Sequence, residues 1–344
     1  MTRLVHRPRL RRVTVVAACS AVVALAACSG DPTGAPTPSV APTSRSAADP
    51  APEAVLDLAR AKAAMADYDK RNNAAARGSY ASLDPKIWRT ADIGPLLLED
   101  DHAVVVRSTT PVSERKPHVD FSMSPEQVFA GADTTLPRLA LVAGSGRGGL
   151  TASEQALTGV RLMVQTREGG RWFNAQSFRV KPAALPGPAL PGTASTAGKA
   201  DRRRLLGLRQ EVLHYLERAT RPTHVDQASV APVRAAVMKV GDTSLADLTV
   251  TCMALPDDSP GAFGVWRTQT GLLGALTLRC QNYAQLKDRG AYMNFDARAR
   301  AVLGIKEKFP QDFTFTFLVQ ALVAVPESGR ATIIAHSTNQ VLTR

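Results

Sequence analysis

Side chains capable of acid–base, nucleophilic or metal chemistry are present in this chain, but they do not form a complete catalytic set. The sequence contains no Gly-x-Ser-x-Gly nucleophile elbow and no His-Glu-x-x-His zinc helix. His214 and His224 lie on opposite sides of a predicted helix end, which does not give metal-ligand geometry. Gly144–Gly149 matches the dinucleotide fingerprint by letter, but Thr151–Leu157 is too short for the helix that would face a pyrophosphate. We expect no metal, no cofactor and no catalytic residue that can be named.

Two other segments carry titratable side chains whose chemistry depends on their surroundings. His336 lies in the last predicted strand, where a register with Val325 opposite Arg330 places it on the apolar face of a hairpin. It is a candidate pocket residue for acid–base chemistry, or a histidine that is hydrogen-bonded within the core. Glu99-Asp100-Asp101-His102 lacks the alternating oxygen ligands of a calcium loop, and we interpret this run as a solvated turn.

The N-terminal segment predicts export and lipid attachment. Five arginines and no acidic residue occur in the first twelve residues, and Val13–Ala27 is almost wholly small and apolar, as in a secretory signal. The ending Leu25-Ala26-Ala27-Cys28 resembles a bacterial lipobox, in which the cysteine becomes the first mature residue and carries a diacylglyceryl lipid. The apolar stretch would rise about 22 Å as a helix, short of a hydrocarbon core of roughly 30 Å. We therefore expect cleavage after residue 27 and anchoring through Cys28 at the extracytoplasmic face of the membrane. Arg11-Arg12 leaves both the Sec and the twin-arginine route open.

Two low-complexity segments divide the rest of the chain. Residues 28–53 are rich in Pro, Ser, Thr and Ala and hold almost no large apolar side chains, so we expect a disordered tether. Residues 183–200 contain three prolines and several glycines and are interpreted as a linker. The predicted domains are therefore residues 54–182 and 201–344.

Cys252 and Cys280 remain after removal of the signal peptide and the lipid site. An even pair in an oxidising compartment favours a disulfide. If residues 263–269 form a strand between the two cysteine strands, however, the thiols are near 10 Å apart, which is too far to bridge. A disulfide and two buried free thiols both remain open.

The charge of the chain indicates its partners only broadly. The formal net charge is +12, of which five charges lie in the signal peptide, leaving 12 − 5 = +7 on the mature chain. Arg202, Arg203 and Arg204 concentrate positive charge at the start of a predicted helix, as a candidate anion-binding cluster or as a solubilising surface. Anionic lipid, anionic wall polymer or another envelope protein fits this location, and nucleic acid does not.

The spacing of apolar residues predicts helices followed by strands in each half. The predicted helices span residues 54–77, 84–90, 201–220 and 296–303, with a helical turn at Ser124–Glu126. The predicted strands of the first half span residues 102–108, 119–123 and 138–143, with a hairpin over 160–180. Those of the second half span residues 230–238, 246–255, 263–269 and 274–280, with a hairpin over 313–325 and 330–337.

Both halves thus share an order of helix, strands and terminal hairpin, which resembles the cystatin/NTF2-like α+β fold. The chain resembles a family of uncharacterised lipoproteins of high-GC Gram-positive bacteria with two such repeats. The likeness is carried by Asp69–Ala76, Arg89–Pro95, Arg161–Trp172, Trp266-Arg267-Thr268 with Gly271, and Leu322–Gly329. The resemblance implies two domains, each with an N-terminal helix packed on a curved antiparallel sheet. It implies no reaction, although in NTF2-like enzymes the inner sheet face lines a pocket, where His336 would project.

The sequence therefore favours a lipid-anchored envelope protein that acts as a non-catalytic binding or scaffold module. The alternative is an extracytoplasmic enzyme or a small-ligand carrier that uses an enclosed pocket. A roomy pocket with several ionisable groups would favour the alternative, and an apolar packed interior would favour the scaffold.

Overall fold

The computed structural model describes residues 53–342, except for 133–134, 188–189, 191–194, 239–245, 257–258, 289–291, 293 and 308–309. The expected signal peptide and most of the tether, including Cys28, lie outside the described residues. The described residues belong to one compact unit, residues 49–344. This unit contains helices and two antiparallel sheets, which confirms the α+β class.

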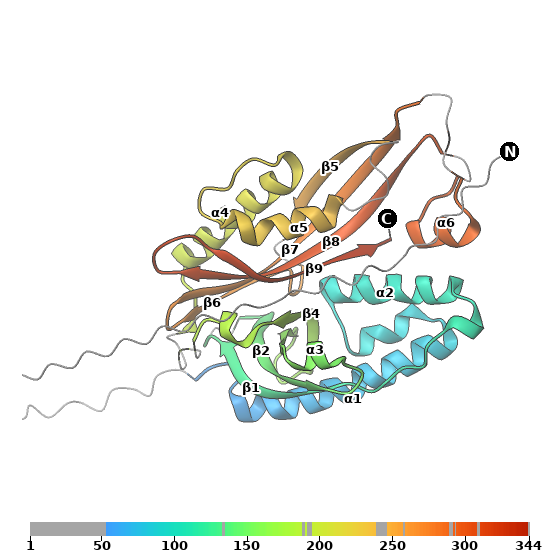
Figure 1. Ribbon diagram of the computed structural model, residues 1–344. Helices are drawn as coiled ribbons and strands as arrows, with labels where there is room; N and C mark the ends of the chain where they lie inside the picture. Colours follow the sequence, from blue (N-terminus) through green and yellow to red (C-terminus); the bar gives the residue numbers. More distant parts are fainter. Residues whose placement is uncertain are drawn as a thin grey trace, which may run out of the picture. The chain divides into compact units, whose positions relative to one another are not determined.

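The first half contains a four-stranded sheet with the strands in sequence order (Figure 1). Its helices are α1 (Leu58–Ser82), η1 (Pro85–Thr90), α2 (Gly94–Thr109), η2 (Val112–Glu114), α3 (Ala152–Gln155) and η3 (Pro182–Ala184). Its strands are β1 (Ser122–Ala130), β2 (Arg138–Arg147), β3 (Thr158–Gln165) and β4 (Trp172–Val180). The predicted hairpin over 160–180 is thus formed by β3 and β4, and Gly169 in its turn has the positive φ of 63° that favours glycine.

The second half contains a five-stranded sheet of order β5-β7-β8-β9, with β6 also paired to β7. Its helices are α4 (Lys199–Arg218), α5 (Gln227–Met238) and α6 (Ala297–Leu303). Its strands are β5 (Ala246–Ala254), β6 (Phe263–Thr268), β7 (Gly271–Leu286), β8 (Asp312–Pro326) and β9 (Thr332–Val341). The long strand β7 pairs with β6 over its first residues and with β5 over its last ones, so β5 and β6 follow one another along one edge.

Four layers stack in the order helix, sheet, sheet, helix (Figure 1). Helix α1 packs on one face of the first sheet through a cluster that includes Met65, Tyr68 and Met163. Helices α4 and α5 cover one face of the second sheet. The two remaining sheet faces meet in a third cluster, in which Leu141 and Val164 pack with Trp266, Leu273 and Leu322. Since both faces of each sheet are buried, apolar residues occupy both sides of several strands.

Helix α1 begins and ends where the local sequence dictates. The Asp57 side chain accepts a hydrogen bond from Arg60 N at 2.7 Å and caps the first turn, and Leu83 ends the helix in the left-handed conformation. Asp84 caps η1 before Pro85, as the sequence predicts. The polar Asp69 and Asn73 are buried with the apolar face of α1, which places one acidic and one amide side chain against the sheet.

Three predicted elements are wrong. Residues 102–108 and 230–238, predicted as strands, lie in α2 and α5, and the predicted helical turn Ser124–Glu126 lies in β1. The buried Val230, Val233 and Val237 recur at helical spacing, so burial by the sheet outweighs the strand preference of valine. A bulge between Pro125 and Gln127 accommodates the proline within β1.

Within the described part of the chain, no helix combines the length and the apolar character that a membrane crossing requires.

Candidate functional site

A cavity of about 230 Å³ opens beside α1 on the helix-covered face of the first sheet. We call it the Tyr68 pocket. Its walls come from α1, the η1–α2 segment and strands β3 and β4, with Phe121 and Met123 at the start of β1. Its polar lining consists of Tyr68, Asn72, Asp92, Asp100, Arg161, Ser177 and Arg179. The pocket therefore contains acidic, basic and neutral hydrogen-bonding groups together.

Tyr68 is the centre of this polar network. Its hydroxyl donates to Asp92 Oδ1 at 2.8 Å, while Asn72 Oδ1, one turn along α1, lies 3.2 Å away. The same hydroxyl accepts a hydrogen bond from Asn174 Nδ2 at 3.3 Å. A backbone bridge between Asp92 and Asn174 joins the end of η1 to strand β4 and fixes this arrangement. Burial and the Asp92 charge raise the pKa of Tyr68, so the phenol stays protonated.

Asp92 and Asp100 form a buried carboxyl pair at one side of the pocket. Asp92 is 2% exposed, the two carboxyl groups hydrogen-bond each other, and no described donor outside the pair reaches Oδ2 of either group. Burial raises the pKa of Asp92 to about 6. Burial, together with the charge of Asp92, raises the pKa of Asp100 well above its ordinary value. Near neutral pH the pair therefore holds one proton, because two adjacent buried carboxylates repel each other.

The opposite charge comes from two arginines on neighbouring strands. Arg161 Nη1 donates to Asp69 Oδ1 at 2.6 Å, and Asp69 Oδ2 accepts from Met123 N at 2.8 Å. Stacking of the Arg161 guanidinium 4.6 Å from the Tyr68 ring centre and 4.9 Å from that of Phe121 fixes it further. Arg161 is therefore part of the wall and is already neutralised.

Arg179 differs from Arg161 because its charge is not neutralised by a bonded carboxylate. Its guanidinium lies 5.1 Å from the Phe121 ring centre, and its buried Nη1 has no hydrogen-bond partner. Burial lowers the pKa of Arg179, although the group stays charged at neutral pH. Gly146 and Gly159 leave room for it, since a Cβ at these positions would lie 3.0 and 3.4 Å from Nη1. Arg179 therefore presents a cation that can bind an anionic or acceptor group.

The predicted pocket residue His336 does not reach this site. In the β8–β9 hairpin, His336 pairs with Ala321, whereas the predicted register pairs it with Val319. The turn already shifts the register by one residue, since Val323 pairs with Ile333 and not with Thr332, and a bulge between Leu322 and Val323 adds the second. His336 does lie on the α4–α5 side of the sheet, as Ala321 does, but it is exposed because β9 is the edge strand.

The other predicted site residues lie in the second half or outside the described residues. Cys252 and Cys280 face each other on β5 and β7 and form a disulfide. The geometric objection to it was wrong, because β6 pairs with another part of the same edge and does not lie between the cysteines. Arg202, Arg203 and Arg204 are exposed on the first turns of α4. Cys28 lies outside the described residues.

The sequence reasoning missed the carboxyl pair. The run Glu99–His102, interpreted as a solvated turn, lies in α2, and Asp101 and His102 are buried. Glu99 accepts hydrogen bonds from Gln320 at 2.6 Å and from Asn339 at 2.8 Å, and burial raises its pKa to about 7. A signal was available, because Gly94-Pro95 before an apolar run is a helix start and places these acids on a helix that must bury one face.

Comparison with family models, with curated proteins and with solved structures finds no match for this chain. Among the described residues, no three His, Cys, Asp or Glu side chains are grouped as ligands for a metal ion.

Proposed function

We propose that the protein binds a small polar molecule in the Tyr68 pocket, as a ligand-binding module held at the extracytoplasmic face of the membrane. The observation that carries this proposal is the set of buried polar groups that line the cavity and have few hydrogen-bond partners within the protein. Arg179 Nη1 is buried without a hydrogen-bond partner among the described residues, and Asp92 and Asp100 hydrogen-bond each other while no other described donor reaches their Oδ2 atoms; all three residues line the cavity. A buried polar group without a partner costs about 1–3 kcal/mol, so the unpartnered Arg179 and a carboxyl pair bonded only to itself and to Tyr68, around one cavity, favour a role in binding.

The size and charges of the pocket limit the ligand. The volume of about 230 Å³ lies below the range of about 300–1,000 Å³ that is usual for small-molecule sites. The carboxyl pair can accept hydrogen bonds or donate its shared proton, and Arg179 can pair with an anionic group. A compact molecule with a hydrogen-bonding or cationic group at one end and an acceptor or anionic group at the other fits both walls.

The setting of this pocket is part of the proposal. The lipobox-like ending at Cys28 and the resemblance to two-repeat lipoproteins support anchoring in the outer face of the membrane. A helix packed on an antiparallel sheet in each half supports a cystatin/NTF2-like architecture, in which the cavity between helix and sheet is the binding site. Binding of another envelope protein or of anionic wall polymer is compatible with a ligand in the pocket.

The test is a thermal-shift screen with the unlipidated unit that begins at Asp49, because all four hydrophobic clusters lie within it. A panel of small amino acids, amines, carboxylates and sugars should contain compounds that raise the unfolding midpoint. Arg179→Gln and Asp92→Asn should abolish the shift, whereas Arg171→Gln, the same change at an exposed residue before β4, should keep it. A stabilising compound that binds both pocket variants as tightly as the wild type would contradict the proposal.

Acid–base catalysis in the same pocket is a second candidate function. The specific observation is the pairing of Asp92, whose pKa is about 6, with Tyr68 and the protonated Asp100. Proton transfer needs a base beside an acid with a higher pKa, and the pKa of Asp92 lies near neutrality while that of Asp100 is raised further. If a bound compound is turned over, and Asp92→Asn abolishes the turnover without weakening the binding, this result would favour catalysis over ligand binding alone.

A further inference from the structure

Helix α4 presents a basic surface, because its three acidic residues form hydrogen bonds within the protein while most of its six cations are exposed. Asp201 Oδ2 accepts hydrogen bonds from Arg267 Nε at 2.7 Å and Gly198 N at 2.9 Å. Glu211 bonds the backbone and ring of His224, and Glu217 accepts from Cys252 N at 2.8 Å. The cations of the helix are Lys199, Arg202, Arg203, Arg204, Arg209 and Arg218, and most of them are exposed.

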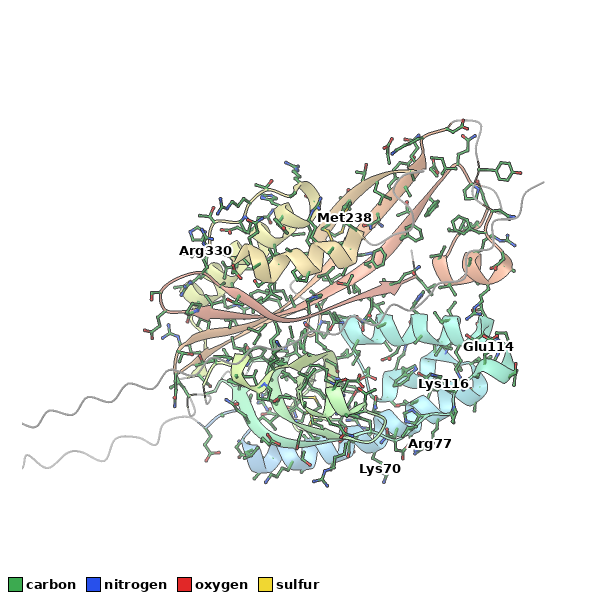
Figure 2. All side chains as sticks on the ribbon, in the orientation of Figure 1. Lys70, Arg77, Glu114, Lys116, Met238 and Arg330 are labelled. Carbon is green, nitrogen blue, oxygen red and sulfur yellow. A yellow bond between two sulfur atoms is a disulfide. The ribbon has the colours of Figure 1, made fainter. Side chains whose placement is uncertain are left out.

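These cations are concentrated at the N-terminal half of α4, beside the β8–β9 turn. The Arg202 guanidinium stacks 5.4 Å from the Phe263 ring centre on one flank of the helix. On the other flank, Arg204 Nη2 donates to Pro326 O at 2.8 Å, and Arg203, Arg204 and Gly329 line a groove of about 320 Å³. Arg330 extends from the end of this turn (Figure 2). Cations at a helix N-terminus are unfavourable, because they oppose the helix dipole. If these arginines served solubility alone, other surface positions would provide it without this cost in stability.

The chain enters the folded unit next to this surface. Val55 N donates to Gly131 O at 2.9 Å, which fixes the residues that follow the predicted tether. Val55 and Arg202 line the same cavity, of about 210 Å³, together with Thr196 and Ala197. The basic surface and the point where the predicted tether joins the unit are therefore neighbours on the protein surface, so docking of this surface on a bilayer leaves the tether beside the membrane.

We propose that Lys199, Arg202, Arg203, Arg204 and Arg330, which we call the basic face, lie against the anionic phospholipid surface of the membrane. This surface is separate from the Tyr68 pocket and goes beyond ligand binding there. Attraction of each Lys or Arg near an anionic bilayer contributes about fivefold in affinity. Docking would orient the unit on the membrane and keep it close to the lipid surface, which the tether alone does not do.

The test is co-sedimentation of the unlipidated unit that begins at Asp49 with vesicles, since a lipid anchor would retain every variant. Vesicles of phosphatidylcholine alone are compared with vesicles that contain phosphatidylglycerol. The paired change Arg202→Glu with Arg203→Glu avoids Arg204, which bonds the turn. The matched control is Lys86→Glu with Lys116→Glu, which makes the same charge change on two exposed residues of the first half, Lys86 in η1 and Lys116 between η2 and β1. Figure 2 labels Lys116. Circular dichroism confirms that each variant is folded.

We expect the unit to bind only the vesicles that contain phosphatidylglycerol. The affinity should fall at least about 25-fold in the Arg202/Arg203 variant and change little in the control. Binding should also weaken as salt rises from about 50 to about 300 mM. Absence of binding to anionic vesicles at low salt would overturn it, as would an equal loss in both paired variants. Displacement from vesicles by inorganic phosphate at matched ionic strength, or tight binding to a soluble anionic polymer without binding to vesicles, would also overturn it.

Discussion

The carboxyl pair of the Tyr68 pocket makes the stability of the protein depend on pH in a way that Asp92→Asn should remove. Burial raises the pKa of Asp92 from 3.8 to about 6 in the folded state. The folded state therefore keeps a proton that the unfolded state releases, and stability falls as pH rises from about 4 to about 6. At about 1.4 kcal/mol per unit of pKa, this loss amounts to about 3 kcal/mol. Asparagine cannot ionise, and its Oδ1 can still accept the Tyr68 hydrogen bond.

The assay is urea unfolding of the wild type and of Asp92→Asn at several pH values. The free energy of unfolding of the variant, relative to that of the wild type, should rise by about 3 kcal/mol from about pH 4 to about pH 7. Removal of the Asp92 charge also lowers the pKa of Asp100, which acts in the same direction. Asp247→Asn, at an exposed carboxylate, is the control and should show no such rise. A difference between Asp92→Asn and wild type that does not change with pH would refute the buried carboxyl pair.

Three further changes test the contacts that hold the pocket and the two sheets. Arg161→Met leaves the Asp69 carboxylate buried without its partner and should cost about 3–5 kcal/mol in urea unfolding; a loss below about 1 kcal/mol, typical of an exposed pair, would contradict a buried one. Replacement of Cys252 and Cys280 by serine opens a loop with a sequence separation of 28 and should lower the free energy of unfolding by about 4 kcal/mol; equal stability of this variant and the oxidised wild type would argue against the disulfide. The folded-state pKa of Glu99 is raised to about 7, so the wild type loses about 3 kcal/mol of stability through this group as pH rises from about 4.5 to about 7. Glu99→Gln should remove this loss. If the free energies of unfolding of wild type and variant change with pH in parallel, the burial of Glu99 against the second sheet is contradicted.

Local patterns predicted the strands and helices whose burial repeats with a regular period. The alternation in β8 and the hairpin of β3 and β4 were visible because one face of each strand is continuously apolar. The helices α2 and α5 were not visible, since their valines have strand propensity and only packing against the sheets decides between the two states. Pairing of the two sheets face to face also left no distinct local signal, because it depends on side chains such as Trp266 that any core would bury.

The candidate site could not be found from the sequence because its residues come from segments far apart in the chain. Tyr68 meets Asp92 across 24 positions and Asn174 across 106 positions. The prediction of a helix over 54–77 placed Tyr68 correctly, but the position of Asp100 depends on α2, which was predicted as a turn followed by a strand. The segments that carry the family resemblance do contain Asn72, Asp92 and Arg161, although their pattern alone did not indicate that they line one cavity.

A crystal structure of the protein with a compound selected by the thermal-shift screen tests the central claim most directly. The account predicts density for the compound inside the Tyr68 pocket, with polar contacts to the Asp92–Asp100 pair on one side and to Arg179 on the other. Density for the compound at another surface, or a pocket closed by the side chains of Phe121 and Arg179, would contradict it.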